Sequence, residues 1–211
     1  MRIRNQEQLE KWLAMTKGPA ATDSAVVSPA KRAPSPVPSK TAPQQRVLGI
    51  DTALRCTGWG LIDVHGNKLS AVDCGVIRNQ NKDPISQCLR RLAGGIRELV
   101  ELYHPQVAVI EGAFYCKNVR TAMVLGSARG AVIAVLAEHE LPVFEYAPRR
   151  VKQSICGFGN ASKQQVALLV AQFLNIHTEQ IALDSTDALA LALCHAQGLT
   201  IAQGLGLPNT I

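Results

Sequence analysis

The chain has 211 residues, of which 47% are apolar, and a formal net charge of +6. This length accommodates one domain with an extension. No uninterrupted apolar run approaches the roughly 18 residues of a membrane span, and the N-terminus lacks the apolar core of a secretory signal. Arg2 and Arg4 faintly resemble a transit peptide, but Glu7 and Glu10 argue against one. We therefore expect a cytoplasmic protein with no membrane partner.

The charge is concentrated near the N-terminus. Residues 1–46 hold eight Lys/Arg against three Asp/Glu, a net +5, whereas the remaining 165 residues hold fourteen against thirteen, a net +1. A basic segment of this kind suits a polyanionic partner, although it could serve solubility alone. Six of the eleven prolines lie in residues 18–46, and proline supports neither helix nor sheet interiors. We expect residues 1–45 to form a disordered extension.

A short apolar pattern precedes the proline-rich stretch. Leu9, Trp12 and Leu13 stand at helical spacing. They would form either a short docking helix or a frayed end, because so short a helix is marginal in water.

From residue 46 onward the pattern becomes that of a folded α/β domain, which we place at residues 46–200 with a short C-terminal tail at 201–211. Apolar runs predict strands at 46–51, 57–64, 70–78, 107–111 and 141–146. Helical periodicity predicts helices at 84–103, 118–139, 161–174 and 184–198. A turn at His65-Gly66-Asn67 joins the second and third strands. This order predicts a mixed sheet, a three-stranded antiparallel meander extended by parallel strands and flanked by helices.

The six cysteines are widely scattered. No Cys-x-x-Cys pair occurs, so a zinc knuckle is not expected, and a chain with an ordinary core needs no disulfide framework. We expect reduced, mostly buried thiols at Cys56, Cys74, Cys88, Cys116, Cys156 and Cys194.

Four carboxylates stand where an active site would form. Asp51 and Glu111 end two predicted strands, and Asp184 and Asp187 lie three residues apart at the start of the last helix, so both face one side. Ligand sites of open α/β sheets gather beyond the carboxyl ends of strands. The four acids are therefore expected to converge there.

Each acid also has an ordinary structural explanation. Asp51 could be a turn residue, Asp184 a helix cap and Asp187 a partner of the helix dipole, and Glu111 a solvated strand end. Together, however, four such acids would repel one another unless cations neutralise them. Hard oxygen ligands suit Mg²⁺ or Mn²⁺, and two such ions about 4 Å apart can activate water and stabilise a leaving oxygen.

Four segments carry a specific resemblance. GIDTALRCTGWG, AVIEGAFYCKN, LPVFEYAPRRVKQSICGFGNASKQQV and DSTDALALALCH, between about Arg46 and Leu199, resemble in order and spacing the blocks of the RuvC family of Holliday junction resolvases. The resemblance implies an RNase H-like fold and a homodimeric endonuclease that cuts four-way junction DNA symmetrically in homologous recombination and repair. It also implies two Mg²⁺ ions per site, replaceable by Mn²⁺, and a possible branch-migration partner of the RuvAB type.

The resemblance also implies residue roles. Asp51, Glu111, Asp184 and Asp187 would be catalytic metal ligands; at the position of Asp184 some family members carry His. Lys152 and Lys163 would be catalytic lysines near the scissile phosphate. The implied DNA-binding residues are Phe114, which would stack on a base at the junction centre, Tyr115, Lys117, Arg149 and Arg150.

Several of these residues have alternatives. The run from Arg149 to Lys152 could be a solvated basic face, and Phe114 could belong to the core. Arg120 and Arg129 are weaker candidates for a function, and we interpret His195 as a helix-face residue.

One departure from the family stands next to the first acid. The family usually has Pro-Gly there, and this chain has Thr52-Ala53. If the family's glycine uses a left-handed backbone, Ala53 would cost roughly 1 kcal/mol or bend the loop differently.

Two other functions are alternatives to that of a junction-cutting nuclease. A strand ending in Gly-Ile-Asp also opens sugar kinases and actin-like ATPases, but those have a glycine-rich phosphate turn and a second large domain. A catalytically impaired junction-binding protein of the same fold is the other alternative.

Overall fold

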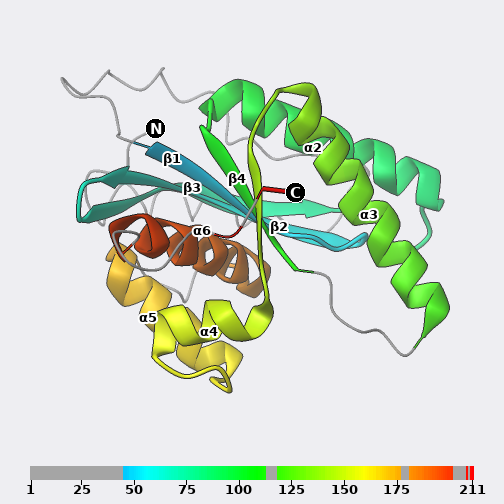
Figure 1. Ribbon diagram of the computed structural model, residues 1–211. Helices are drawn as coiled ribbons and strands as arrows, with labels where there is room; N and C mark the ends of the chain where they lie inside the picture. Colours follow the sequence, from blue (N-terminus) through cyan, green and yellow to red (C-terminus); the bar gives the residue numbers. More distant parts are fainter. Residues whose placement is uncertain (1–44, 113–117, 177–180, 202–207, 209) are drawn as a thin grey trace.

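The computed structural model describes residues 45–112, 118–176, 181–201, 208 and 210–211. A mixed sheet in the order β3-β2-β1-β4-β5 lies at its centre (Figure 1). The first three strands form an antiparallel meander, and β4 and β5 run parallel to β1, which confirms the predicted sheet. The strands are β1 (Gln45–Asp51), β2 (Cys56–His65), β3 (Lys68–Arg78), β4 (Val107–Glu111) and β5 (Val143–Tyr146).

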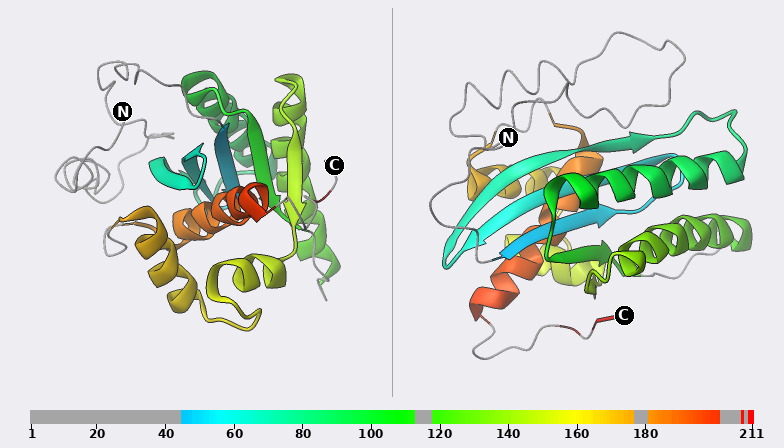
Figure 2. Two further views of the ribbon diagram at one scale, coloured as in Figure 1. Left: turned by 60° about the vertical axis from the view of Figure 1, so that its left-hand side comes forward. Right: turned by 90° about the horizontal axis from the view of Figure 1, so that it is seen from above.

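Helices cover both faces of this sheet. The helices are α2 (Ile85–Tyr103), α3 (Val119–Glu138), α4 (Pro148–Cys156), α5 (Lys163–Leu174) and α6 (Leu183–Ile201). Helices α2 and α3 lie on one face, whereas α6 lies on the other with α4 and α5 beside it (Figures 1 and 2). The four predicted helices are confirmed, with ends that differ by a few residues.

Helix α4 was missed by the sequence prediction, which assigned no helix between β5 and α5. The helix has nine residues, and its buried face consists of Val151 and Ile155, which is too short a pattern to indicate a helix. Its boundaries nevertheless carry ordinary signals: Pro148 occupies the first turn, and Gly157 ends the helix in the left-handed conformation, with φ of 82°. Proline at the start and glycine just past the end are the preferred residues at these positions.

The predicted hairpin between β2 and β3 is confirmed. Gly66 and Asn67 form the turn between His65 and Lys68, and Gly66 has a φ of 58°. Two-residue hairpin loops require such positive φ values, which glycine adopts without strain.

The cysteines agree with the prediction of unpaired thiols. Cys74, Cys88 and Cys194 are free and buried, and Cys56 and Cys156 are free and partly buried. Cys116 lies outside the described residues.

Strand alternation decides which side chains face which helices. Leu48 and Ile50 of β1 pack in the core beneath α2 and α3, whereas Val47 packs in the core beneath α6. Since successive side chains of a strand point to opposite faces, Asp51 faces α6. The same alternation in β4 brings Glu111 to the α6 face.

Three glycines let the backbone of α6 approach the sheet closely. A Cβ atom built on Gly49, Gly58 or Gly60 would lie 2.0, 1.9 or 2.6 Å from atoms of α6. Gly49 is paired with Gly60, and Gly58 with Asp51, so the glycines adjoin one another and the first acid. At Gly49 and Gly58 the added atom would collide with the backbone of α6, whereas at Gly60 it would meet the side chain of Leu189.

We predict that Gly49→Ala lowers the free energy of unfolding by about 3 kcal/mol or more, because its Cβ must displace the backbone of α6. Gly94→Ala is the matched control. Its Cβ meets nothing within 4 Å, and alanine favours the interior of α2, so this variant should gain about 0.5–1 kcal/mol. Urea denaturation measures both; a Gly49→Ala protein as stable as the wild type would contradict the close packing.

Candidate active site

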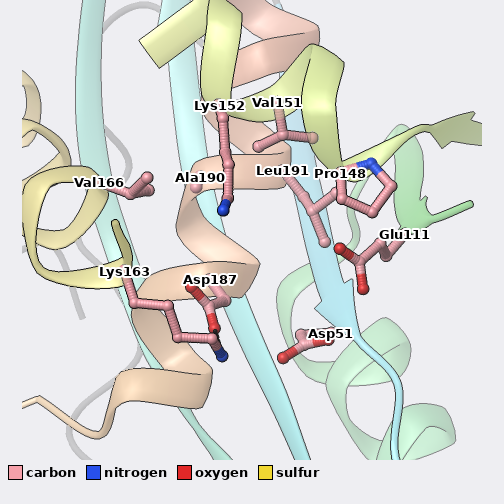
Figure 3. A pocket seen from close by; sticks show the side chains of 10 residues that line it. All are labelled: Asp51, Glu111, Pro148, Val151, Lys152, Lys163, Val166, Asp187, Ala190 and Leu191. Atoms are coloured by element: carbon pink, nitrogen blue, oxygen red, sulfur yellow. Dashed lines mark hydrogen bonds and ion pairs between the residues drawn. The ribbon is translucent and has the colours of Figure 1, made fainter. Parts of the chain in front are cut away.

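Two acidic side chains stand at the carboxyl ends of neighbouring parallel strands. Strands β1 and β4 pair in register up to Ile50 and Ile110, so the next residues, Asp51 and Glu111, emerge side by side. Both line one cavity of about 380 Å³ (Figure 3). The predicted convergence of these two acids is therefore found in the structure.

Three helices complete the cavity. Helix α6 contributes Asp187, α4 contributes Lys152 and α5 contributes Lys163. Figure 3 shows both lysine side chains directed toward the space that the carboxylates border. The remaining wall is largely apolar and consists of Pro148, Val151, Val166, Ala190 and Leu191. The site thus joins acids, ammonium groups and a wall that limits hydration.

The carboxylates disfavour one another's ionisation. Burial, and then the negative charges of Glu111 and Asp187, raise the pKa of Asp51 to about 7, although Lys163 opposes the shift. Burial and Asp187 likewise raise the pKa of Glu111. A cation placed among these groups would relieve this repulsion.

Lys163 is the ammonium group most directly engaged with the acids. Its Nζ lies 2.8 Å from Oδ2 of Asp187, and this hydrogen bond raises the pKa of Lys163. Lys163 begins α5, directly after Ser162, which forms a capping box with Gln165. The cap fixes the helix start and so places the lysine beside the acids.

The fourth predicted acid, Asp184, does not line the cavity. It lies in the first turn of α6, where its Oδ2 accepts a hydrogen bond from Sγ of Cys56 at 2.8 Å. Its charge still contributes to the raised pKa of Asp51. Burial and this hydrogen bond raise the pKa of Cys56 to about 11, so the thiol stays protonated and donates a hydrogen bond to Asp184.

The chemistry of the donors fits a hard divalent cation. Asp51, Glu111 and Asp187 offer oxygen ligands of the kind that Mg²⁺ and Mn²⁺ prefer, and burial together with the neighbouring negative charges raises the pKa of Asp51 and of Glu111. Within the described ranges, no three His, Cys, Asp or Glu side chains are grouped closely enough to hold an ion as placed. A cation among them therefore requires side-chain rotation.

The strain considered at Ala53 is not present. Ala53 is not among the described residues with positive φ, so its backbone is open to any L-residue. Its N–H donates to Oγ1 of Thr57 at 3.2 Å, and Nδ2 of Asn79 donates to the carbonyl of Leu54 at 2.6 Å. These bonds hold the loop that follows Asp51 without a glycine.

The predicted DNA-binding residues divide into two groups. Arg149 and Arg150 are exposed on α4, with the guanidinium of Arg150 5.1 Å from the ring centroid of Tyr146. Phe114, Tyr115 and Lys117 lie outside the described residues. Leu9, Trp12 and Leu13 also lie outside them.

His195 has a structural role, in line with its interpretation as a helix-face residue. It is fully buried on α6, its Nδ1 lies 3.1 Å from the hydroxyl of Tyr146, and burial lowers its pKa to about 4. It is therefore neutral near pH 7. Of the two weaker candidates on α3, Arg120 is exposed and Arg129 is partly buried.

Comparisons with known proteins agree on one family. The sequence model described as "Crossover junction endodeoxyribonuclease RuvC" matches residues 47–195. The proteins of that name from Ralstonia pickettii and Dechloromonas aromatica are 43% and 41% identical to the chain; the matches cover 72% and 78% of this chain and 84% and 90% of theirs. The structure described as "T. thermophilus RuvC in complex with Holliday junction substrate" superposes with a TM-score of 0.72 at 27% identity, covering 80% of this chain and all of that one. The expected RNase H-like fold is thereby confirmed.

We predict that Glu111→Gln lowers the pKa of Asp51, because it removes the negative charge that opposes ionisation most strongly. Lys163→Gln should raise the same pKa, since it removes the opposing positive charge. A titration of the Asp51 carboxyl followed by carbon NMR in metal-free buffer measures both shifts. Shifts of the same sign in the two variants would contradict the arrangement of charges.

Proposed function

Because the chain belongs to the RuvC family of crossover junction endodeoxyribonucleases, we propose that it resolves Holliday junctions by metal-dependent phosphodiester hydrolysis in recombination and repair. The observation that carries this proposal is the shared cavity. Asp51, Glu111 and Asp187 border it together with Lys152 and Lys163. This combination of hard ligands and cations suits a reacting phosphate group.

Asp51, Glu111 and Asp187 would hold the metal at the cavity, and we retain Asp184 of α6 as the proposed fourth ligand. When bound, two Mg²⁺ ions, or Mn²⁺ in their place, supply the charge that activates water and stabilises the phosphate. Lys152 and Lys163 place ammonium groups at the position where negative charge develops on the phosphate. The apolar wall reduces hydration on one side of the cavity, which strengthens the charge interactions made there.

The DNA contacts extend from this cavity along α4. Arg149 and Arg150 are exposed beside Lys152, where they would contact the sugar–phosphate backbone without reading sequence. We retain Phe114, Tyr115 and Lys117 as proposed junction contacts on the family resemblance. The division into a basic extension at 1–45, a nuclease domain at 46–200 and a tail at 201–211 belongs to the same proposal.

Helix α3 supports a homodimer. Val119 and Met123 are 73% and 69% exposed, although the helix is apolar. By length and composition alone α3 could cross a membrane, but α3 packs against α2, and its Arg129 is ion-paired with Glu145. We propose that a second copy of the chain covers the exposed face, which gives two cavities for two strands of four-way junction DNA.

The cellular setting follows from this substrate. A branch-migration motor of the RuvAB type is the proposed partner, and the bacterial relatives make the cytoplasm the proposed location. Kinase and ATPase functions are set aside because the family match spans residues 47–195, nearly all of the proposed nuclease domain. The three acids around the cavity favour an active enzyme over an impaired junction binder.

We predict that Asp51→Asn abolishes cleavage while leaving the fold and junction binding intact, because asparagine keeps the shape and removes a metal-ligating charge. Thermal stability should not fall, since the substitution also removes repulsion by Glu111 and Asp187. Asp63→Asn is the control: Asp63 is ion-paired with Arg46 at the far end of the β1–β2 pair, and its loss should leave cleavage unchanged. Nicking of synthetic four-way junctions in Mg²⁺, with binding measured in Ca²⁺, tests both. Normal cutting by Asp51→Asn would disprove the proposed site.

We further predict that Lys163→Ala slows single-turnover cleavage by about 10-fold or more and weakens junction binding much less, because its charge acts on the reacting phosphate. Lys152→Ala should behave in the same way. Lys68→Ala, in the exposed β2–β3 hairpin, is the control for loss of a lysine. A loss of junction affinity in both variants, with an unchanged single-turnover cleavage rate, would mean that the two cavity lysines are ordinary contacts to the DNA backbone.

A further inference from the structure

Arg129 of α3 contacts the end of β4 that carries Glu111. Its Nη1 donates to the backbone carbonyl of Glu111 at 2.6 Å, and its Nη2 donates to Oε2 of Glu145 on β5, also at 2.6 Å. The two side chains of this ion pair are only 21% and 30% exposed. One guanidinium thus joins the helix to two adjacent strands.

These contacts are made from the face opposite the cavity. Val143, two residues before Glu145, packs in the core beneath α2 and α3, so Glu145 faces α3 as well. The carboxylate of Glu111, in contrast, lines the cavity on the α6 face. Arg129 therefore binds the backbone of Glu111 from the α3 face of the sheet, whereas the side chain of Glu111 points into the cavity on the α6 face.

The end of β4 has few other attachments. Its pairing with β1 stops at Ile110, so among the described residues Glu111 has one strand partner, Tyr146 of β5. The next residue, Gly112, donates its N–H to the carbonyl of Tyr146 at 2.8 Å. A Cβ at Gly112 would lie 2.9 Å from Oε1 of Glu145, so this glycine leaves room for the carboxylate that binds Arg129.

We propose that Arg129 is a positioning residue for Glu111, which it holds through the backbone in the orientation that cation binding and cleavage require. The inference rests on the proposed function of the cavity. A strand end that is hydrogen-bonded on one side would otherwise fray, and misplacement of one ligand weakens a metal site. Groups that orient the ligands of a metal typically contribute about 10- to 100-fold to affinity or activity.

The test compares Arg129→Gln with Arg97→Gln. Arg97 of α2 donates to Glu138 at the other end of α3 at 3.0 Å, so this control also removes an arginine–glutamate ion pair that involves α3. Binding of Mn²⁺ to the DNA-free full-length chain is measured by electron paramagnetic resonance, and single-turnover cleavage of a four-way junction is measured across a Mg²⁺ titration. Arg129→Gln should lower Mn²⁺ affinity and raise the half-saturating Mg²⁺ concentration by about 10-fold or more. Arg97→Gln should change neither, and junction binding in Ca²⁺ should stay the same in both.

Two conservative variants keep the inference testable if Arg129→Gln fails to fold. Arg129→Lys has one ammonium group, which cannot reproduce the two-armed contact, and Glu145→Gln removes the charge that holds the guanidinium. Both variants should show Mn²⁺ affinities between those of the wild type and Arg129→Gln. Intermediate affinities are evidence for positioning, because loss of global stability alone would not shift the metal dependence of a folded protein.

The possible results distinguish the positioning role of Arg129 from the proposed function of the cavity. Wild-type Mn²⁺ affinity in Arg129→Gln, Arg129→Lys and Glu145→Gln, in a protein that cuts junctions, would overturn the positioning role and leave the proposed function intact. A wild-type chain that neither binds Mn²⁺ nor cuts would overturn both.

Discussion

The close packing of α6 on the sheet is the constraint on which the site depends. Gly49, Gly58 and Gly60 leave no room for a side chain between the helix and strands β1 and β2. Because the helix lies so near, Asp187 reaches the cavity bordered by the strand-end acids. A larger residue at Gly49 or Gly58 would lift α6 and separate its acid from Asp51, so the packing that stabilises the domain also assembles the candidate chemistry.

This packing has an electrostatic cost. Bringing Asp51 and Glu111 together with Asp187 in a half-enclosed cavity raises the pKa of both strand-end acids, which means that their ionised forms are disfavoured in the folded chain. Lys163 offsets part of this repulsion through its ion pair. A divalent cation would remove much of the rest, so the folded chain should gain stability when it binds.

Local patterns predicted the parts of the site that depend on local structure. The positions of Asp51 and Glu111 followed from strand alternation and from the rule that parallel strands end at one edge. Helix α4 was missed although Pro148 and Gly157 mark its ends, because a short helix gives little periodicity to detect. The contact of Cys56 with an acid 128 residues away depends on tertiary packing, and no local pattern indicates it.

Glu111 joins the two faces of the sheet. Its carboxylate belongs to the α6 face, where the acids and lysines gather, while its carbonyl is held by Arg129 from the α3 face. The same α3 carries the exposed apolar residues Val119 and Met123. If a second copy of the chain covers that surface, it contacts the helix that supports Glu111. The proposed dimer surface and the arginine that holds the Glu111 backbone therefore belong to one helix.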